Sequence, residues 1–150
     1  MKSLVTNHHY LARATTEPPQ RFGNDFEGAA AEVPTKGYGA AGFALLQELQ
    51  KLVPAATGYA VHYPAAMGTE NQGAADIVKW LTARSAACPQ QKYALGGHSQ
   101  GGFAVVNAVP QLPPAILTRV VAISMFGSPE CKEETADRCI SYCADGDIVC

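Results

Sequence analysis

A serine at the tip of a glycine-rich turn carries the clearest chemical signal in this sequence. Residues 97–101 read Gly-His-Ser-Gln-Gly, the G-x-S-x-G pattern in which a tight strand-to-helix turn exposes a serine hydroxyl. The same turn points the backbone N–H of Gln100 at the place where a tetrahedral oxyanion would form. The pattern therefore predicts that Ser99 is a nucleophile and that Gln100 donates a hydrogen bond to the oxyanion.

The residues on either side of this turn support that interpretation. An apolar stretch that begins at Lys92 and ends in glycines comes before Ser99, and a helix is expected from Phe103 to Val109 after it. A strand followed by a helix is the context in which the pattern carries chemistry. A glycine-rich turn without chemistry is the alternative that the pattern leaves open.

Strands and helices are expected to alternate along the whole chain. Apolar runs and helical spacing place them at the following residues: strands at 5–11, 58–63, 120–126 and 138–142, and helices at 41–52 and 71–87. This alternation predicts an α/β fold, a three-layer α/β/α sandwich with a central, mainly parallel sheet of about five strands. We expect residues 1–150 to form one domain.

Composition argues against several classes of function. The 150 residues have a formal net charge of −2 and no basic run, which argues against a nucleic-acid partner. No apolar stretch approaches the length of a membrane span. The N-terminus starts with a positive charge, but the polar residues 6–9 interrupt it, so we recognise no complete signal peptide. We expect no cofactor.

Four of the five cysteines lie between residues 131 and 150. The spacing of Cys139 and Cys143 is tolerable for zinc, but no second pair at matching spacing accompanies them, so we expect no metal site. A small disulfide loop is favoured instead, which implies an oxidising compartment. The odd number leaves at least one thiol without a partner inside this chain.

Five segments, in order along the chain, resemble motifs of the cutinase family, which are small secreted serine esterases with a compact α/β-hydrolase fold. The segments are Ala-Arg-Ala-Thr-Thr-Glu at 12–17, Cys-Pro at 88–89, Gly-Gly-His-Ser-Gln-Gly at 96–101, Phe-Gly-Ser-Pro at 126–129 and Cys-Ala-Asp-Gly-Asp-Ile-Val-Cys at 143–150. The resemblance covers the chain from about residue 10 to its last residue.

The resemblance implies a role for each matching residue. Ser99 would attack an ester carbonyl, and Asp147 would orient the catalytic histidine, with Asp145 as a competing carboxylate. The backbone N–H of Gln100 and the backbone N–H and hydroxyl of Thr15 would form the oxyanion hole. Glu17 matches the first motif, where a solvated or loop-bracing role is expected.

The resemblance also bears on the cysteines. Cys143 and Cys150 would form the disulfide that fixes the loop of Asp147. Cys131 and Cys139 are additional to the family pattern. They could pair with each other, which would leave Cys88 free.

The sequence departs from the family where the catalytic histidine is expected. In the family this histidine follows the last motif, and the sequence ends at Cys150. His98 adjoins Ser99, but the turn aims its side chain away from the hydroxyl, which leaves a packing or substrate-edge role. His62 is expected in the core or at its rim, and His8 and His9 on opposite faces of the first strand.

We therefore expect a chain truncated before the catalytic histidine and the final helix, and incomplete at its N-terminus. Such a chain would be inactive or severely impaired. It would also expose apolar surface and be poorly soluble.

Two functions are weighed for this chain. The first is a secreted carboxylic ester hydrolase, a monomer when complete, that cleaves aliphatic or acetyl esters through an acyl-serine intermediate. Its substrate would be an ester, including polymers such as a cutin-like polyester or an acetylated polysaccharide. The second is a catalytically incomplete scaffold that binds an apolar ligand or surface, or a fragment of a gene model.

Overall fold

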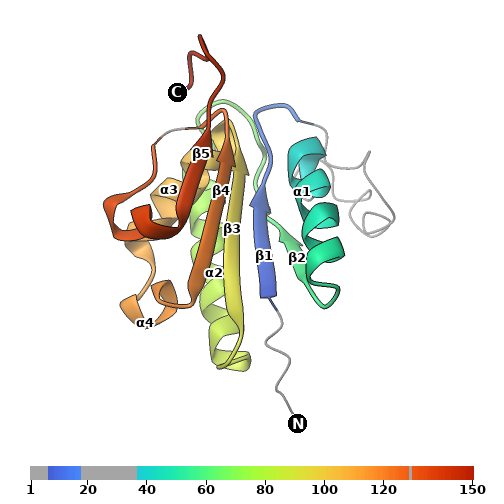
Figure 1. Cartoon of the computed structure of the whole chain (residues 1–150). Coiled ribbons are helices and arrows are strands. Elements are labelled where there is room, and N and C mark those ends of the chain that lie inside the picture. The colour runs from blue at the N-terminus through green and yellow to red at the C-terminus, as the bar shows by residue number, and fades with distance from the viewer. Residues whose placement is uncertain (1–6, 18–36, 129) are drawn as a thin grey trace.

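A single sheet of five parallel strands forms the centre of the computed structural model, which describes residues 7–17, 37–128 and 130–150 (Figure 1). The strands lie in the order β2–β1–β3–β4–β5. Their bounds are β1 Asn7–Ala12, β2 Thr57–Ala60, β3 Lys92–His98, β4 Val120–Phe126 and β5 Cys139–Tyr142. The predicted α/β class and the sheet of about five strands are confirmed. Residues 5 and 6 of the expected first strand lie outside the described residues.

Helices cover both faces of the sheet. Their bounds are α1 Gly39–Leu52, α2 Glu70–Ala87, α3 Gln100–Ala108 and α4 Pro114–Leu117, with 3-10 turns η3 Val109–Gln111 and η4 Glu133–Arg138. Helix α1 lies on one face, and α2 and α3 lie on the other (Figure 1). Within the described ranges, no helix combines the length and the apolar character that crossing a membrane requires.

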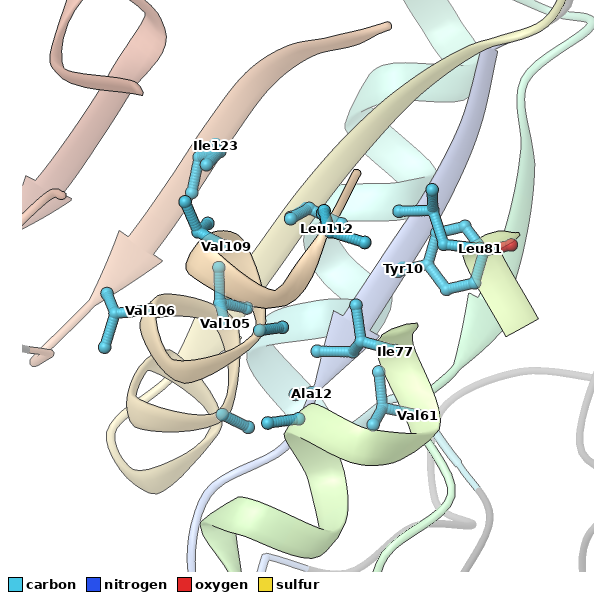
Figure 2. Close-up of a cluster of buried hydrophobic side chains, with 14 of the residues drawn as sticks. Tyr10, Ala12, Val61, Ile77, Leu81, Val105, Val106, Val109, Leu112 and Ile123 are labelled. Carbon is cyan, nitrogen blue, oxygen red and sulfur yellow. The ribbon is translucent and has the colours of Figure 1, made fainter. Parts of the chain in front are cut away.

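Alternation along β1 shows how one strand serves both layers. Leu11 packs with Leu46 in the cluster under α1, whereas Tyr10 belongs to the larger cluster under α2 and α3. Figure 2 shows this larger cluster, with Tyr10 near Leu81 of α2. Apolar residues on both faces are what a parallel sheet covered on both sides requires.

Two elements differ from their expected bounds by three residues at one end, and the others by at most two residues. The helix predicted from Phe103 begins at Gln100, immediately after Ser99, because the first turn is built from glycines that give no apolar signal. The strand predicted over 58–63 ends at Ala60, although the N–H of Val61 still donates to the carbonyl of Leu11 at 3.0 Å.

Three short elements were not expected, namely η3, α4 and η4. Pro114 opens α4, since proline is well suited to the first position of a helix. The turn η4 consists of polar residues without apolar periodicity.

Apolar side chains are exposed on the last two strands. Ile140 and Tyr142 of β5 are each 53% exposed, and Val121 of β4 is 44% exposed. The ring of Tyr142 stacks on Phe126 with centroids 5.3 Å apart. The expected exposure of apolar surface is therefore present on this part of the sheet.

The buried stripe of α2 should dominate the stability of the layer that it forms. Leu81 is 0% exposed, whereas Leu52 at the end of α1 is 80% exposed. We expect Leu81→Ala to lower the free energy of unfolding by about 2–5 kcal/mol because it leaves a cavity. The matched control Leu52→Ala should change it by less than about 0.5 kcal/mol. Urea unfolding followed by circular dichroism measures both, and equal losses would contradict this packing.

Candidate active site

Ser99 lies at the end of β3 in a strained backbone conformation. Its φ is 50° and its ψ is −116°, in a region that residues with side chains rarely adopt. The N–H of Ser99 donates to the carbonyl of Phe126 at 2.9 Å, and its carbonyl accepts from Gly102 at 2.8 Å. Bonds to β4 and to the first turn of α3 therefore hold the serine in this conformation.

Close backbone contacts explain both glycines of the turn. A Cβ at Gly97 would lie 2.5 Å from the backbone of Gly101. A Cβ at Gly101 would lie 2.1 Å from the carbonyl oxygen of Ala12. Helix α3 thus starts against the end of β1, at a distance that excludes any side chain.

The serine opens onto a cavity of about 460 Å³. Ser99 itself is half-buried, so its side chain is not enclosed by the core. The cavity wall includes polar and apolar side chains, namely Thr15, Met67, Glu70, Gln100, Phe103 and Val149. The structure thus brings Thr15, Ser99 and Gln100 to one cavity. Met67, Glu70 and Phe103 are wall residues that sequence reasoning missed, because they belong to no motif.

The Gln100 side chain joins three segments beside the serine. Its Oε1 accepts a hydrogen bond from the hydroxyl of Thr15 at 2.9 Å. Its Nε2 donates to the carbonyl of Ala66 at 2.6 Å and to Oε2 of Glu70 at 3.1 Å. Two acceptors on the Nε2 side fix the orientation of the amide, because only the nitrogen can donate.

This orientation limits what Thr15 can offer to an oxyanion. A threonine hydroxyl has one proton to donate, and that of Thr15 is donated in the hydrogen bond to Gln100. The donors that the arrangement leaves for an oxyanion are therefore backbone N–H groups. The N–H of Gln100 is the first of α3, and such N–H groups have no partner within their helix.

Asp147 lies in the loop closed by the Cys143–Cys150 disulfide. It is half-buried, whereas Asp145 in the same loop is exposed. Its Oδ1 accepts from the N–H of Val149 at 2.9 Å. Its Oδ2 would lie 3.0 Å from a Cβ placed on Gly127, which follows β4. The loop thus packs Asp147 against the end of the strand next to β3.

The disulfide that the resemblance implies is present, and so is the additional pairing that the sequence left open. Cys143 is bonded to Cys150, and Cys131 to Cys139. Cys88 is the free cysteine of the described residues. Within the same ranges, no group of three or more potential metal ligands gathers.

Glu17 braces the loop that carries Thr15. Its carboxylate accepts hydrogen bonds from the N–H groups of Ala14 at 2.7 Å and of Ala40 at 2.6 Å, the second at the start of α1. Nδ1 of His98 lies 3.1 Å from Oε2 of Glu17. The loop-bracing role expected for Glu17 is confirmed, and His98 packs against this brace.

The contact between Glu17 and His98 changes both pKa values. The hydrogen bond to Glu17 raises the pKa of His98 above 6.5, against burial, which lowers it. The charge of Asp147 adds to this rise. Burial alone raises the pKa of Glu17, but the bonds from His98 and from backbone N–H groups outweigh burial and lower the pKa below 4.5.

The other histidines lie in or beside the first strands. His8 and His9 are buried in β1, and Nδ1 of His8 is 2.6 Å from the hydroxyl of Thr57. His62 is half-buried, its ring lies tilted against that of Tyr59, and its backbone N–H donates to Asp76. His98 is the histidine that lies next to the serine, and Glu17 holds its ring.

Comparison with known proteins agrees with this geometry. The sequence pattern of the family described as Cutinase matches residues 8–150. Carboxylesterase Culp1 of Mycobacterium tuberculosis (strain ATCC 25618 / H37Rv) is 34% identical over 74 residues, which are 47% of this chain and 34% of that protein. The chain therefore spans about a third of the length of this curated relative.

Two solved structures share the fold. A cutinase-like protein from Cryptococcus sp. has a TM-score of 0.76 and 22% identity, covering 97% of this chain and 78% of its own. The catalytic core domain of acetyl xylan esterase from Trichoderma reesei has a TM-score of 0.71 and 20% identity, covering 99% of this chain and 86% of its own.

The pair of Glu17 and His98 should make stability depend on pH. Because the pKa of His98 is raised, its contribution to the free energy of unfolding is fully present below pH 6.5. This contribution is lost as the pH rises through the pKa that His98 has in the folded protein. Because the pKa of Glu17 is lowered, its contribution is present above pH 4.5 and is lost as the pH falls through the folded pKa.

Glu17→Gln keeps an acceptor but removes the charge. We expect it to destabilise the protein most between pH 4.5 and 6.5, and progressively less as the pH rises further. Urea unfolding across this pH range measures the difference. The control is Glu48→Gln, which removes an exposed glutamate paired with Lys51. A loss for Glu17→Gln that grows above pH 6.5 would contradict the pairing with His98.

Proposed function

Because this chain belongs to the cutinase family, we propose that it carries the nucleophile of a carboxylic ester hydrolase that cleaves aliphatic or acetyl esters. One observation supports this proposal above the others. The strained turn presents Ser99 to an open cavity at the point where α3 begins. A nucleophile and the N–H groups of a helix start then face the same space.

The proposed reaction proceeds through an acyl-serine intermediate. Oγ of Ser99 attacks the ester carbonyl, and the N–H groups of Gln100 and Thr15 stabilise the oxyanion that forms. Collapse of the tetrahedral intermediate that carries this oxyanion breaks the bond to the alcohol, which leaves with a proton, and the acyl-serine remains. Water then attacks the acyl group, releases the acid and restores the serine.

The proposed base is a histidine that follows Cys150 in the protein, held by Asp147. The order serine, acid, histidine along the chain is usual for this type of fold. The histidine takes the serine proton and later gives it to the leaving alcohol. Asp147 fixes the tautomer of the ring and stabilises its charged form.

The cavity wall supports an ester with an aliphatic or acetyl group. Met67, Phe103 and Val149 supply apolar surface beside Ser99, and Met67 is 87% exposed. Such an open apolar wall suits alkyl and acetyl esters, including those at the surface of a cutin-like polyester or an acetylated polysaccharide. We place the protein outside the cell, where its two disulfides would persist.

Ser99→Ala should abolish ester hydrolysis. The experiment uses the protein expressed from its full coding sequence, with p-nitrophenyl butyrate as substrate and release of p-nitrophenol as the readout. We expect a loss on the order of 10⁵–10⁶-fold, the range seen when a hydrolase loses its serine. Thr82→Ala, an exposed substitution on α2, serves as the control. Hydrolysis that persists in Ser99→Ala would exclude the serine mechanism, and a parent protein without hydrolysis would favour an inactive scaffold.

The two carboxylates of the disulfide loop should differ sharply. Asp147→Asn is expected to lower kcat by about 10⁴-fold, because the amide no longer holds the histidine in the right tautomer. Asp145→Asn, in the same loop but exposed, should leave kcat within about twofold. The same assay measures both variants, and reversed effects would move the acid to Asp145.

A further inference from the structure

A second cavity lies between α2 and the first two strands. Its volume is about 280 Å³, and Tyr10, Tyr59, Trp80 and Arg84 line it. Trp80 and Arg84 lie in the second half of α2, which leads into the start of β3. Ser99 follows the opposite, C-terminal end of β3 (Figure 1). None of the lining residues belongs to the cavity of Ser99.

Aromatic rings form one wall of this second cavity, which we call the aromatic pocket. The ring centroids of Tyr59 and Trp80 are 6.1 Å apart, and those of Tyr10 and Tyr59 are 5.2 Å apart. Tyr10 is 1% exposed and Trp80 is 42% exposed, so the wall runs from the core to the surface. Small residues line the pocket from α2, namely Ala83 and Ala87. A planar apolar group could therefore stack on the rings of this wall, and the small alanine side chains leave space for such a group.

One positively charged side chain lines this pocket. Of the described side chains that line the pocket, Arg84 is the one that is charged at neutral pH, since burial and then Arg84 itself lower the pKa of His8 to about 4. Nε of Arg84 donates to Oε1 of Gln91 at 2.6 Å, which orients the guanidinium. No carboxylate of the described residues lies within ion-pair distance of Arg84.

The hydroxyl of Tyr59 in the wall already has a partner. The hydroxyl of Tyr59 donates to Oδ2 of Asp76 at 2.9 Å, so it stays in place as part of the wall. A ligand that complements the pocket thus needs an apolar planar body and one anionic group for Arg84. A guanidinium is well suited to bind a carboxylate with paired hydrogen bonds.

We propose that the aromatic pocket binds a small aromatic carboxylate, with its ring against Trp80 and Tyr59 and its carboxylate on Arg84. The site is independent of the esterase proposed for Ser99. Binding there requires no reaction, and the ligand leaves unchanged.

The pocket contains its own probe, because Trp80 lies in its wall and is the one tryptophan among these 150 residues. Titration of the full protein with cinnamate should change the Trp80 fluorescence in a saturable way. Cinnamamide, which has the same ring and no charge, should bind at least about tenfold more weakly, the value of one lost charge-assisted bond. Octanoate should also bind more weakly than cinnamate, and equal affinity for octanoate would refute a site selective for aromatic groups.

Two variants change different features of the pocket. Arg84→Gln should weaken binding of cinnamate at least about tenfold, and Ala87→Leu should block it by filling the space. Lys79→Gln is the matched control, because Lys79 contacts the Trp80 ring at 5.0 Å but does not line the pocket. Circular dichroism confirms that each variant is folded. Unchanged affinity in Arg84→Gln or in Ala87→Leu would overturn the proposal.

The thiol of Cys88 gives a second readout, since it also lines the pocket and is free. Bound cinnamate should slow its reaction with a maleimide, and it should do so equally in Ser99→Ala. This result separates the two proposals, because Ser99→Ala removes hydrolysis without touching the pocket. A fluorescence change that disappears in Ser99→Ala, or that leaves Cys88 equally reactive, would place the ligand elsewhere and refute the site.

Discussion

The contact between the start of α3 and the end of β1 is the constraint on which the candidate active site depends. At Gly101 the helix backbone meets the carbonyl of Ala12 so closely that no side chain fits. This contact, with the bonds from β4, holds Ser99 in a backbone conformation that a free chain would leave. It also sets the loop after β1 beside the first turn of α3. The positions of the proposed nucleophile and of both proposed oxyanion donors therefore depend on this contact together with the bonds from β4.

Two polar side chains then hold that loop from opposite sides. Glu17 connects it to the start of α1 and to His98, while Gln100 connects it to the start of α2 through Ala66 and Glu70. Both side chains are largely shielded from water, and hydrogen bonds to a charged group are strong in such shielded surroundings. The hydroxyl of Thr15 donates to Gln100 and so takes part in this bracing. The proposed oxyanion hole therefore consists of backbone N–H groups, which such a fixed loop holds in place.

The sequence could predict what depends on local pattern. The strand 120–126 was predicted with its observed bounds because a run of apolar residues is typical of a strand covered on both faces. The start of α3 at Gln100 could not be predicted, because Gly101 and Gly102 are poor helix formers that only the tertiary contact with β1 explains. Glu70 could not be recognised as a partner of Gln100 either, since thirty positions separate them and no motif joins them. The bracing role of Glu17 could be predicted, because Glu17 belongs to a motif that marks its loop.

The two cavities share helix α2 but should act independently. Glu70 in its first turn lines the cavity of Ser99, and Arg84 lies fourteen residues later, about 20 Å along the helix axis at 1.5 Å per residue. Between them Ala74, Ile77 and Leu81 are fully buried against the sheet and α3. A packed stripe of this kind resists small shifts, because a helix that slides loses all of its contacts at once. Coupling between the sites would require two stable positions of α2 that each ligand prefers differently. Because this buried stripe favours one position of α2, occupancy of the aromatic pocket should leave the geometry at Ser99 unchanged.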